Sequence, residues 1–136
     1  MYKRQIDETA TGQPAAVFLG FGDRLPVLKK RSEFIAASKA RYQTAPSLTV
    51  QARDRGDGDP TVRVGFTCSK KVGNAVARNR AKRRLREIAR LDLLDHAKPG
   101  HDYVLIGKKD ATAQRPFDDL RGDFVRALAK LHGQTR

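Results

Sequence analysis

Apolar and polar residues alternate along the first half of the chain with periods that predict one helix followed by two strands. Ser32 can cap a short helix over residues 32–41. Alternation with a period of two predicts a strand over residues 44–53 and a second, clearer strand over residues 61–69. Residues 54–60 contain three aspartates, two glycines and a proline, a composition that predicts a hairpin loop between the two strands.

The second half of the chain predicts two longer helices that flank one buried strand. Asn74 is a candidate cap for a helix over about residues 74–94. Residues 99–100, Pro-Gly, end this pattern, residues 102–109 predict a strand, and Pro116 suits the first turn of a last helix. The apolar stripe of the first helix is Ala77, Ala81, Leu85, Ile88 and Leu91, and that of the second is Phe117, Leu120, Phe124, Leu128 and Leu131. The order α-β-β-α-β-α predicts an α+β fold, a two-layer sandwich of helices on a small sheet.

The length of 136 residues suits one domain, which we place over residues 25–136, behind a flexible N-terminal extension over residues 1–24. The single cysteine excludes a disulfide framework. The longest apolar run, residues 15–22, is too short to span a bilayer, and acidic Asp7 and Glu8 precede it where a secretory signal needs positive charge. These features predict a soluble, cytoplasmic protein that does not bind a membrane.

Positive charge is concentrated in one segment of the chain. The formal net charge is +13, from 28 Lys and Arg against 15 Asp and Glu. Residues 60–86 contain nine basic residues and no acid. A charge run is ordinarily a solvated face, but repulsion within such a segment destabilises a free protein unless an anionic partner supplies the counter-charge. Phosphate groups are suited to that role, and the sequence predicts that the chain binds nucleic acid.

The chain carries no combination of residues that is typical of catalysis. It has no glycine-rich phosphate loop, no nucleophile elbow, and three histidines without the spacing of metal ligands. Cys68 falls on the apolar face of its predicted strand, where core packing is the expected role. We therefore expect no catalytic residue and no metal site in the protein itself.

Residues 63–87 closely resemble the signature of the bacterial ribonuclease P protein family. The centre of the match is the tripeptide Arg-Asn-Arg at residues 78–80, followed by further basic residues. Residues 28–34 are similar to the segment with which that family begins its first helix. The predicted order of helices and strands also agrees, so the resemblance extends over roughly residues 25–131.

The resemblance implies a fold and a function. The fold would be ribosomal protein S5 domain 2-like, with a left-handed β-α-β crossover, a handedness that runs against the general rule for parallel strands. The function would be that of the protein subunit of ribonuclease P, an endoribonuclease that removes the 5′ leader from precursor tRNA. In that family a catalytic RNA performs the cleavage with Mg²⁺ that is bound mainly by the RNA. One protein copy, a monomer, would bind each RNA and the leader of the precursor tRNA.

The resemblance also implies site residues, position by position. Those that would face the catalytic RNA are Lys70, Lys71, Arg78, Asn79, Arg80, Lys82, Arg83 and Arg86. Those that would bind the leader, in a cleft between the first helix and the sheet, are Phe34, Gln51, Thr67 and Ser69. Ser38 stands where the family commonly has an aromatic residue, and Gln51 where some relatives have tyrosine, so we expect more polar and basic contacts here. Without the resemblance Phe34 would be assigned to the core, and both roles are compatible if its ring forms the floor of the cleft.

Three other functions are open from the residues alone. A ribosomal or ribosome-assembly protein has the same small, basic α+β character. A sequence-specific DNA-binding helix would need polar, base-reading side chains, whereas the exposed side of this helix offers almost only Arg and Lys, which suits phosphate contact. A protein-only nuclease would need a cluster of carboxylates or histidines. The ordered match over residues 63–87 favours the ribonuclease P family over all three.

Overall fold

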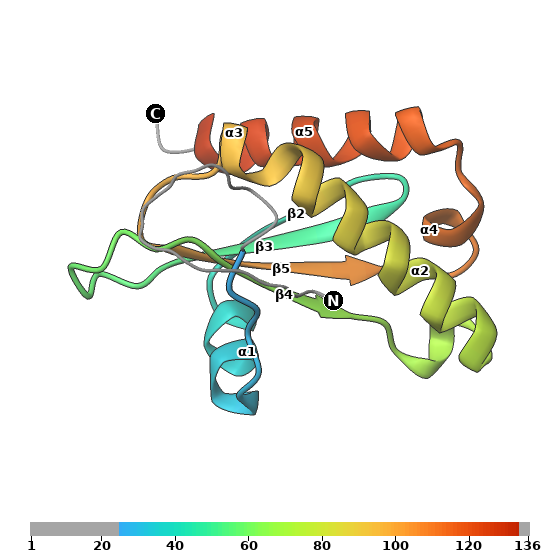
Figure 1. Cartoon of the computed structure of the whole chain (residues 1–136), viewed down its shortest axis with the longest axis horizontal. Coiled ribbons are helices and arrows are strands. Elements are labelled where there is room, and N and C mark those ends of the chain that lie inside the picture. Colours follow the sequence, from blue (N-terminus) through green and yellow to red (C-terminus); the bar gives the residue numbers. More distant parts are fainter. Residues whose placement is uncertain (1–24, 134–136) are drawn as a thin grey trace, which may run out of the picture.

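The computed structural model describes residues 25–133 and contains a four-stranded sheet in the order β2-β3-β5-β4 (Figure 1). The strands are β2 (Arg41–Thr44), β3 (Leu48–Asp54), β4 (Arg63–Thr67) and β5 (His101–Gly107). β3 pairs antiparallel with both β2 and β5, while β4 runs parallel to β5 at the edge of the sheet. The N-terminal extension that we expect over residues 1–24 lies outside the described residues.

Helices lie on both faces of this sheet. α2 (Ala75–Ile88) and α5 (Phe117–Gly133) cover one face, and the shorter α1 (Arg31–Ser38) lies against the other (Figure 1). The short elements among the described residues are the 3₁₀ turn η2 (Lys70–Val72), the π-helical turn η3 (Ala89–Leu93), α3 (Leu94–His96) and α4 (Ala111–Gln114). The predicted α+β class is confirmed, with α1 as partial cover on the second face.

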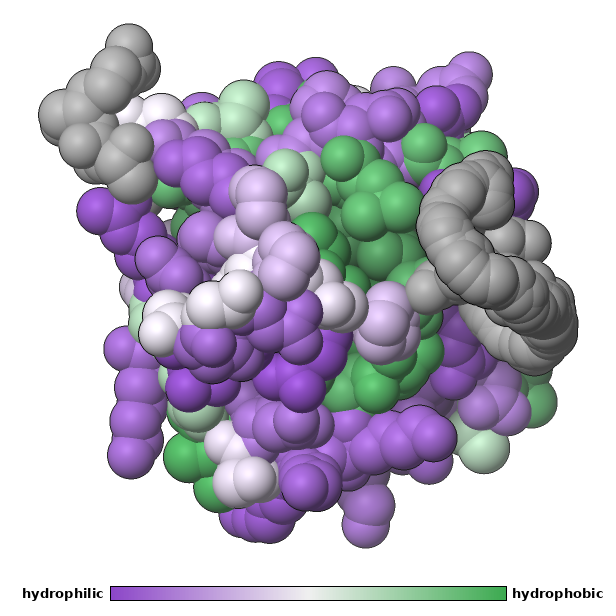
Figure 2. Space-filling model, turned by 60° about the vertical axis from the view of Figure 1, so that its left-hand side comes forward, coloured by the Kyte–Doolittle hydropathy of each residue, from purple (hydrophilic) through white to green (hydrophobic). Residues whose placement is uncertain are grey.

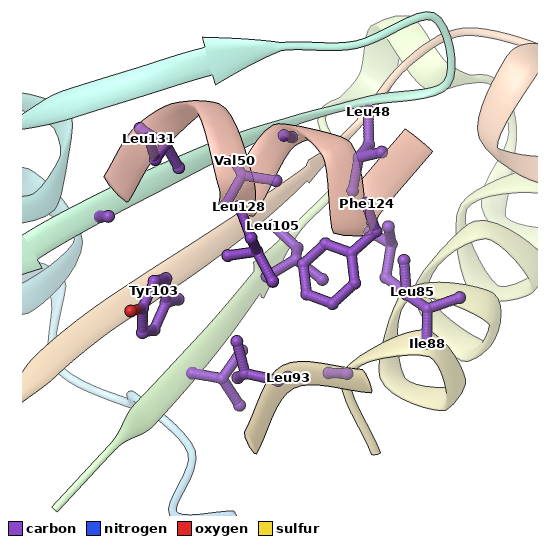
Figure 3. Close-up of a cluster of buried hydrophobic side chains, with 14 of the residues drawn as sticks. Leu48, Val50, Leu85, Ile88, Leu93, Tyr103, Leu105, Phe124, Leu128 and Leu131 are labelled. Atoms are coloured by element: carbon purple, nitrogen blue, oxygen red, sulfur yellow. The ribbon is translucent and has the colours of Figure 1, made fainter. Parts of the chain in front are cut away.

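The main core lies between the sheet and the two long helices, and it follows from the two periodicities of the sequence. Leu48 and Val50 of β3 point to this side, as do Tyr103 and Leu105 of β5 (Figure 3). The opposite wall comes from the predicted stripes: Leu85 and Ile88 of α2, and Leu120, Phe124, Leu128 and Leu131 of α5. Hydrophilic side chains dominate the face in Figure 2, where the largest hydrophobic area lies near the middle and smaller ones lie towards the edges, as expected when most apolar residues are buried.

The segment after α1 differs from the prediction. The sequence predicts a helix to residue 41 and a strand from residue 44, whereas α1 ends at Ser38 and residues 41–44 form the additional strand β2. β2 is an edge strand whose residues are mostly exposed, so it carries no apolar alternation that a sequence pattern could reveal. Contacts with distant residues hold it instead. Arg41 Nη1, for example, donates a hydrogen bond to the carbonyl of Leu131 in α5 at 3.3 Å.

The predicted hairpin loop over residues 54–60 is wrong, because β3 and β4 are not neighbours and β5 lies between them. Arg55 holds this loop at the beginning of β5, where its backbone N donates to the carbonyl of Gly100 at 3.1 Å. The Arg55 guanidinium also donates to the carbonyls of Asp59 at 2.9 Å and Thr61 at 2.6 Å. Aspartate and glycine indicate a turn, but they do not determine which strands the turn joins.

The β-α-β crossover that the resemblance implies joins the parallel strands β4 and β5 through α2. Asn74 caps α2 as predicted, since its Oδ1 accepts a hydrogen bond from the backbone N of Ala77 at 2.9 Å. Gly73 precedes the cap with φ at 145°, in the region that favours glycine, and a Cβ there would lie 2.9 Å from the Cβ of Ala77. The left-handed sense of the crossover stays a prediction.

A buried carboxylate joins the segments around β4. Asp102 of β5 has no solvent exposure, and it accepts two hydrogen bonds from Arg63 of β4 and one from Arg55, all at 2.8 Å. Arg63 Nη1 also donates to Glu33 of α1 at 3.0 Å. Burial by itself raises the pKa of Asp102, but the hydrogen bonds from the two arginines outweigh it, and this pKa lies below its ordinary value. The network connects α1, the loop, β4 and β5.

We expect Asp102→Asn to destabilise the protein by roughly 3 kcal/mol at neutral pH, because two arginines lose their buried counter-charge. The folded pKa of Asp102 lies below the unfolded value of about 4, so the stabilisation is present above about pH 4 and is lost as the pH falls through the folded pKa. Thermal melts across the acid range should therefore show that the difference in melting temperature between wild type and variant becomes smaller as the pH falls. Asp95→Asn, at an exposed site, is the control. A gap that does not change with pH would contradict this role of Asp102.

Candidate nucleic-acid interface

A cleft of about 470 Å³ lies between α1 and the face of the sheet that α2 and α5 leave uncovered. Its lining combines rings, cations, polar side chains and an apolar floor: Lys29, Arg31, Phe34, Ser38, Gln51, Phe66, Thr67, Val104 and Ile106. Phe34, Gln51 and Thr67, predicted to bind the leader, are among these residues. The fold thus brings together side chains from α1, β3 and β4 that are distant in the sequence.

Phe34 belongs to the wall of the cleft because Gly65 of β4 leaves room for its ring. A Cβ atom on Gly65 would lie 2.6 Å from Phe34 Cε1, so a larger residue there requires the ring to move. The half-buried ring also packs with Leu28, Ala37 and Val104 in a small cluster separate from the main core. Phe34 is therefore both a packing residue and a lining residue, and its contact with a ligand stays a prediction.

Cations from η2 and α2 form a second region, which we call the basic surface: Lys70, Lys71, Arg78, Arg80, Lys82, Arg83 and Arg86. Arg78 and Lys82 are half-buried, and the other members are exposed, as is Asn79. Within residues 25–133, no carboxylate lies within ion-pair distance of any of them. The residues predicted to face the catalytic RNA all lie on η2 and α2.

Arg84, in the middle of the same stretch, has a structural role. Its guanidinium donates hydrogen bonds to the carbonyls of Thr112 at 2.9 Å and Arg115 at 2.5 Å, which ties α2 to the α4 turn. Burial lowers the pKa of Arg84, and the nearby charge of Arg80 acts in the same direction. Arg84 therefore positions α2, while its neighbours present their charge to the outside.

Buried carboxylates elsewhere are matched with arginines. The pairs are Asp102 with Arg53, Arg55 and Arg63, Asp123 with Arg115 and Arg126, and Asp92 with Arg121. These carboxylates therefore neutralise arginines that belong to the fold. The positive charge of the basic surface is left for an external anion to neutralise.

The basic surface and the cleft meet at the edge strand β4. Arg78, Lys82 and Arg86 are spaced four residues apart, so they share one side of α2, and all three act electrostatically on the thiol of Cys68 just after β4. The Arg86 guanidinium lies 5.8 Å from the centroid of the Phe66 ring, and Phe66 also lines the cleft. Phe66 therefore adjoins both the cleft and the basic surface.

Ser69, the remaining residue predicted to bind the leader, is not among the residues that line the cleft. Its exposed hydroxyl accepts a hydrogen bond from the backbone N of Lys71 at 3.3 Å and caps η2, between the cleft and the basic surface. Its neighbour Cys68 is half-buried against the main core, as predicted. Burial raises the pKa of this thiol, so it is protonated at neutral pH and is not a reactive thiolate.

Sequence reasoning missed two cations of the cleft, Lys29 and Arg31. Both fall within residues 28–34, the segment that is similar to the helix start of the family, so a signal was present. Which cations of this segment turn towards the sheet depends on where α1 begins. The predicted cap at Ser32 is wrong, because the N-cap is Lys30 and Ser32 lies in the first turn of α1.

The described residues lack other kinds of site. Among them, no group of three or more His, Cys, Asp or Glu side chains could hold a metal ion. Residues 25–133 also include no helix that is long and apolar enough to cross a membrane. What the arrangement can do is bind nucleic acid, with cations for phosphates and with rings and polar side chains for bases.

Comparisons with known proteins point to one family. A protein-family model described as Ribonuclease P matches residues 23–132. The ribonuclease P protein component of Ruegeria pomeroyi is 61% identical over 120 residues, which cover 88% of this chain and 96% of the relative. That of Caulobacter vibrioides is 52% identical over 104 residues, covering 76% of this chain and 69% of the relative. Among solved structures, the RNase P protein of Staphylococcus aureus matches with a TM-score of 0.64 and 25% identity, covering 79% of this chain and 98% of that one.

The contact between Gly65 and Phe34 can be tested by a double-mutant cycle. We expect Gly65→Ala to destabilise the protein by about 1–3 kcal/mol, because the new Cβ forces the Phe34 ring out of its place. In a Phe34→Ala background the same substitution should lower the free energy of unfolding by clearly less, since the ring is absent. Urea unfolding of the four proteins measures the coupling. Strictly additive effects would mean that the ring does not occupy the space above Gly65.

Proposed function

The chain belongs to the ribonuclease P protein family, and we propose that it binds the catalytic RNA through its basic surface and the 5′ leader of precursor tRNA through the cleft. As a member of this family it is the protein component of a tRNA-processing ribonucleoprotein, so RNA is its partner. The observation that carries the finer proposal is the junction at β4. There, cations without an acidic partner in the described chain meet a cleft lined by rings and polar side chains.

The basic surface suits a folded RNA because its cations have no acidic partner in the described chain and are distributed along η2 and α2. From Arg78 to Arg86 the cations of α2 extend over about 12 Å of helix, at 1.5 Å per residue. Their guanidinium and ammonium groups can contact several phosphates of one backbone. The helix α2 is held in place by its apolar stripe and by the contacts of Arg84 while its cations contact the RNA.

The cleft suits an unpaired strand, because only an unpaired nucleotide can turn its base towards the ring of Phe34. Gln51 and Thr67 add donors and acceptors for base edges, and Lys29 and Arg31 add charge for phosphates. Mature tRNA lacks the leader. Binding in the cleft therefore favours the substrate over the product.

In this proposal the RNA performs the cleavage, and Mg²⁺ is bound mainly by the RNA. Residues 25–133 contain no cluster that could hold a metal ion, and no step assigned to the protein runs through one. The contribution of the chain is to bind and to orient. Its cations reduce the repulsion between the phosphates of the two RNAs, and the held leader fixes the position of the precursor.

We propose that one monomer binds each RNA. The net charge of +13 opposes association between free copies of the chain. The large hydrophobic residues that are exposed in the described part of the chain come from separate segments: Val27, Ile35, Tyr42, Val76 and Leu94. Single exposed apolar residues of this kind are normal at the surface of a monomer.

The basic surface can be tested by removing two of its exposed cations. We expect Arg80→Ala with Arg83→Ala to weaken binding of the ribonuclease P RNA and to lower the slope of log affinity against log salt by about 2, one for each lost phosphate contact. Lys39→Ala with Lys130→Ala removes the same charge from exposed positions outside the basic surface and serves as the control. If both double variants lose the same RNA affinity, the effect depends on net charge alone, and this result would contradict a specific role of the basic surface.

The cleft can be tested at Phe34 with two substitutions that separate stacking from packing. Phe34→Leu keeps an apolar side chain but removes the flat ring, whereas Phe34→Ala removes both. If the ring stacks on a leader base, both variants should lose about 5- to 100-fold in affinity for precursor tRNA. Their binding of mature tRNA should be unchanged. The measurement is affinity of the reconstituted enzyme against leader length, and full affinity in Phe34→Leu would leave Phe34 with a packing role alone.

A further inference from the structure

Tyr42 of β2 lies on the same face of the sheet as the cleft. It pairs with Gln51 of β3 in antiparallel register, and directly opposite residues project to the same side. Gln51 lines the cleft. Two residues further along the same strands, Thr44 and Thr49 form a hydrogen bond between their side chains at 3.0 Å, which confirms this alternation. The Tyr42 side chain therefore stands beside the cleft.

Tyr42 and Phe34 lie at opposite ends of one row of residues across the sheet. The row continues from Gln51 to Val104 of β5 and from Val104 to Gly65 of β4, where the Phe34 ring sits. Three strand spacings separate β2 from β4, which amounts to about 14 Å. Two rings thus bound a strip of sheet whose middle is formed by one polar and one apolar side chain.

The fold itself does not account for the position of this ring. Tyr42 is 65% exposed, and within the described part of the chain its hydroxyl has no hydrogen-bond partner. Its neighbour Arg41 points to the opposite face, where it binds the carbonyl of Leu131 in α5. An exposed ring beside a cleft that already holds Phe34 and polar side chains has the composition of a platform for unpaired bases.

We propose that Tyr42 is a second base-stacking residue, which extends the leader-binding cleft across β2. This inference rests on the proposed function, because the ligand is an unpaired nucleotide of the 5′ leader. Phe34 and Tyr42 would contact different nucleotides of the same strand, since the two rings are too far apart to share one base. Any base offers a π face, so Tyr42 adds affinity with little dependence on sequence.

The test uses the enzyme reconstituted with the ribonuclease P RNA and precursor tRNAs whose leaders increase in length. We expect Tyr42→Ala to lose about 5- to 10-fold in affinity for long leaders, with no loss for mature tRNA. Tyr42→Phe keeps the ring and should bind like the wild type. Leu94→Ala removes an exposed hydrophobic side chain in α3 and serves as the matched control. In a leader that lacks one base, the affinity lost in a variant should disappear when the missing base is the one that its ring contacts. The position of that base should differ between Tyr42→Ala and Phe34→Ala.

Tyr42→Trp gives a second readout, because the chain contains no other tryptophan. Its fluorescence should be quenched by precursor tRNA with a long leader and not by mature tRNA. The proposal is overturned if Tyr42→Ala binds every leader like the wild type, if its loss is the same with mature tRNA, or if both rings depend on the same nucleotide. If leader length does not matter even for the wild type, leader binding itself fails, and that result is distinct from a failure at Tyr42 alone.

Discussion

The buried charge of Asp102 is the constraint on which the arrangement of the site depends. A carboxylate without solvent is strongly unfavourable in a β-strand unless cations reach it. Arg55 and Arg63 do so from the loop and from β4, and their need for this partner determines where those segments run. Arg63 extends the network to Glu33, which also accepts a hydrogen bond from the backbone N of Lys30 at the start of α1. One wall of the cleft is thereby fixed by a charge in the sheet.

The pairing of structural acids with structural arginines also determines the electrostatics of the surface. Arginines that hold the fold face carboxylates or backbone carbonyls, as Arg84 does at the end of α4. The cations of the basic surface face outward without such partners in the described chain. Their mutual repulsion lowers the stability of the free protein and is relieved when phosphates bind. In the proposed function, stability and RNA affinity are therefore linked through the same side chains.

The sequence predicts those parts of the fold that depend on residues close together in the chain. The apolar stripes of α2 and α5 and the cap at Asn74 each lie within one helix. β2 and the path of residues 54–60 could not be predicted in this way, since they depend on edge pairing and on the distant Asp102. The exposed cations of α2 follow from charge alone. The grouping of Phe34 with residues of β3 and β4 came from the resemblance, because no local pattern places a helix over a particular strand.

The most direct test of the division of labour between protein and RNA is cleavage of precursor tRNA across a range of Mg²⁺ concentrations. The ribonuclease P RNA is assayed alone and with this chain, and the chain is assayed alone. No cleavage is expected from the chain by itself. Adding it to the RNA should move the Mg²⁺ requirement to lower concentrations, because its cations take over part of the neutralisation of the phosphates. Cleavage without RNA, or an unchanged Mg²⁺ requirement, would contradict the account.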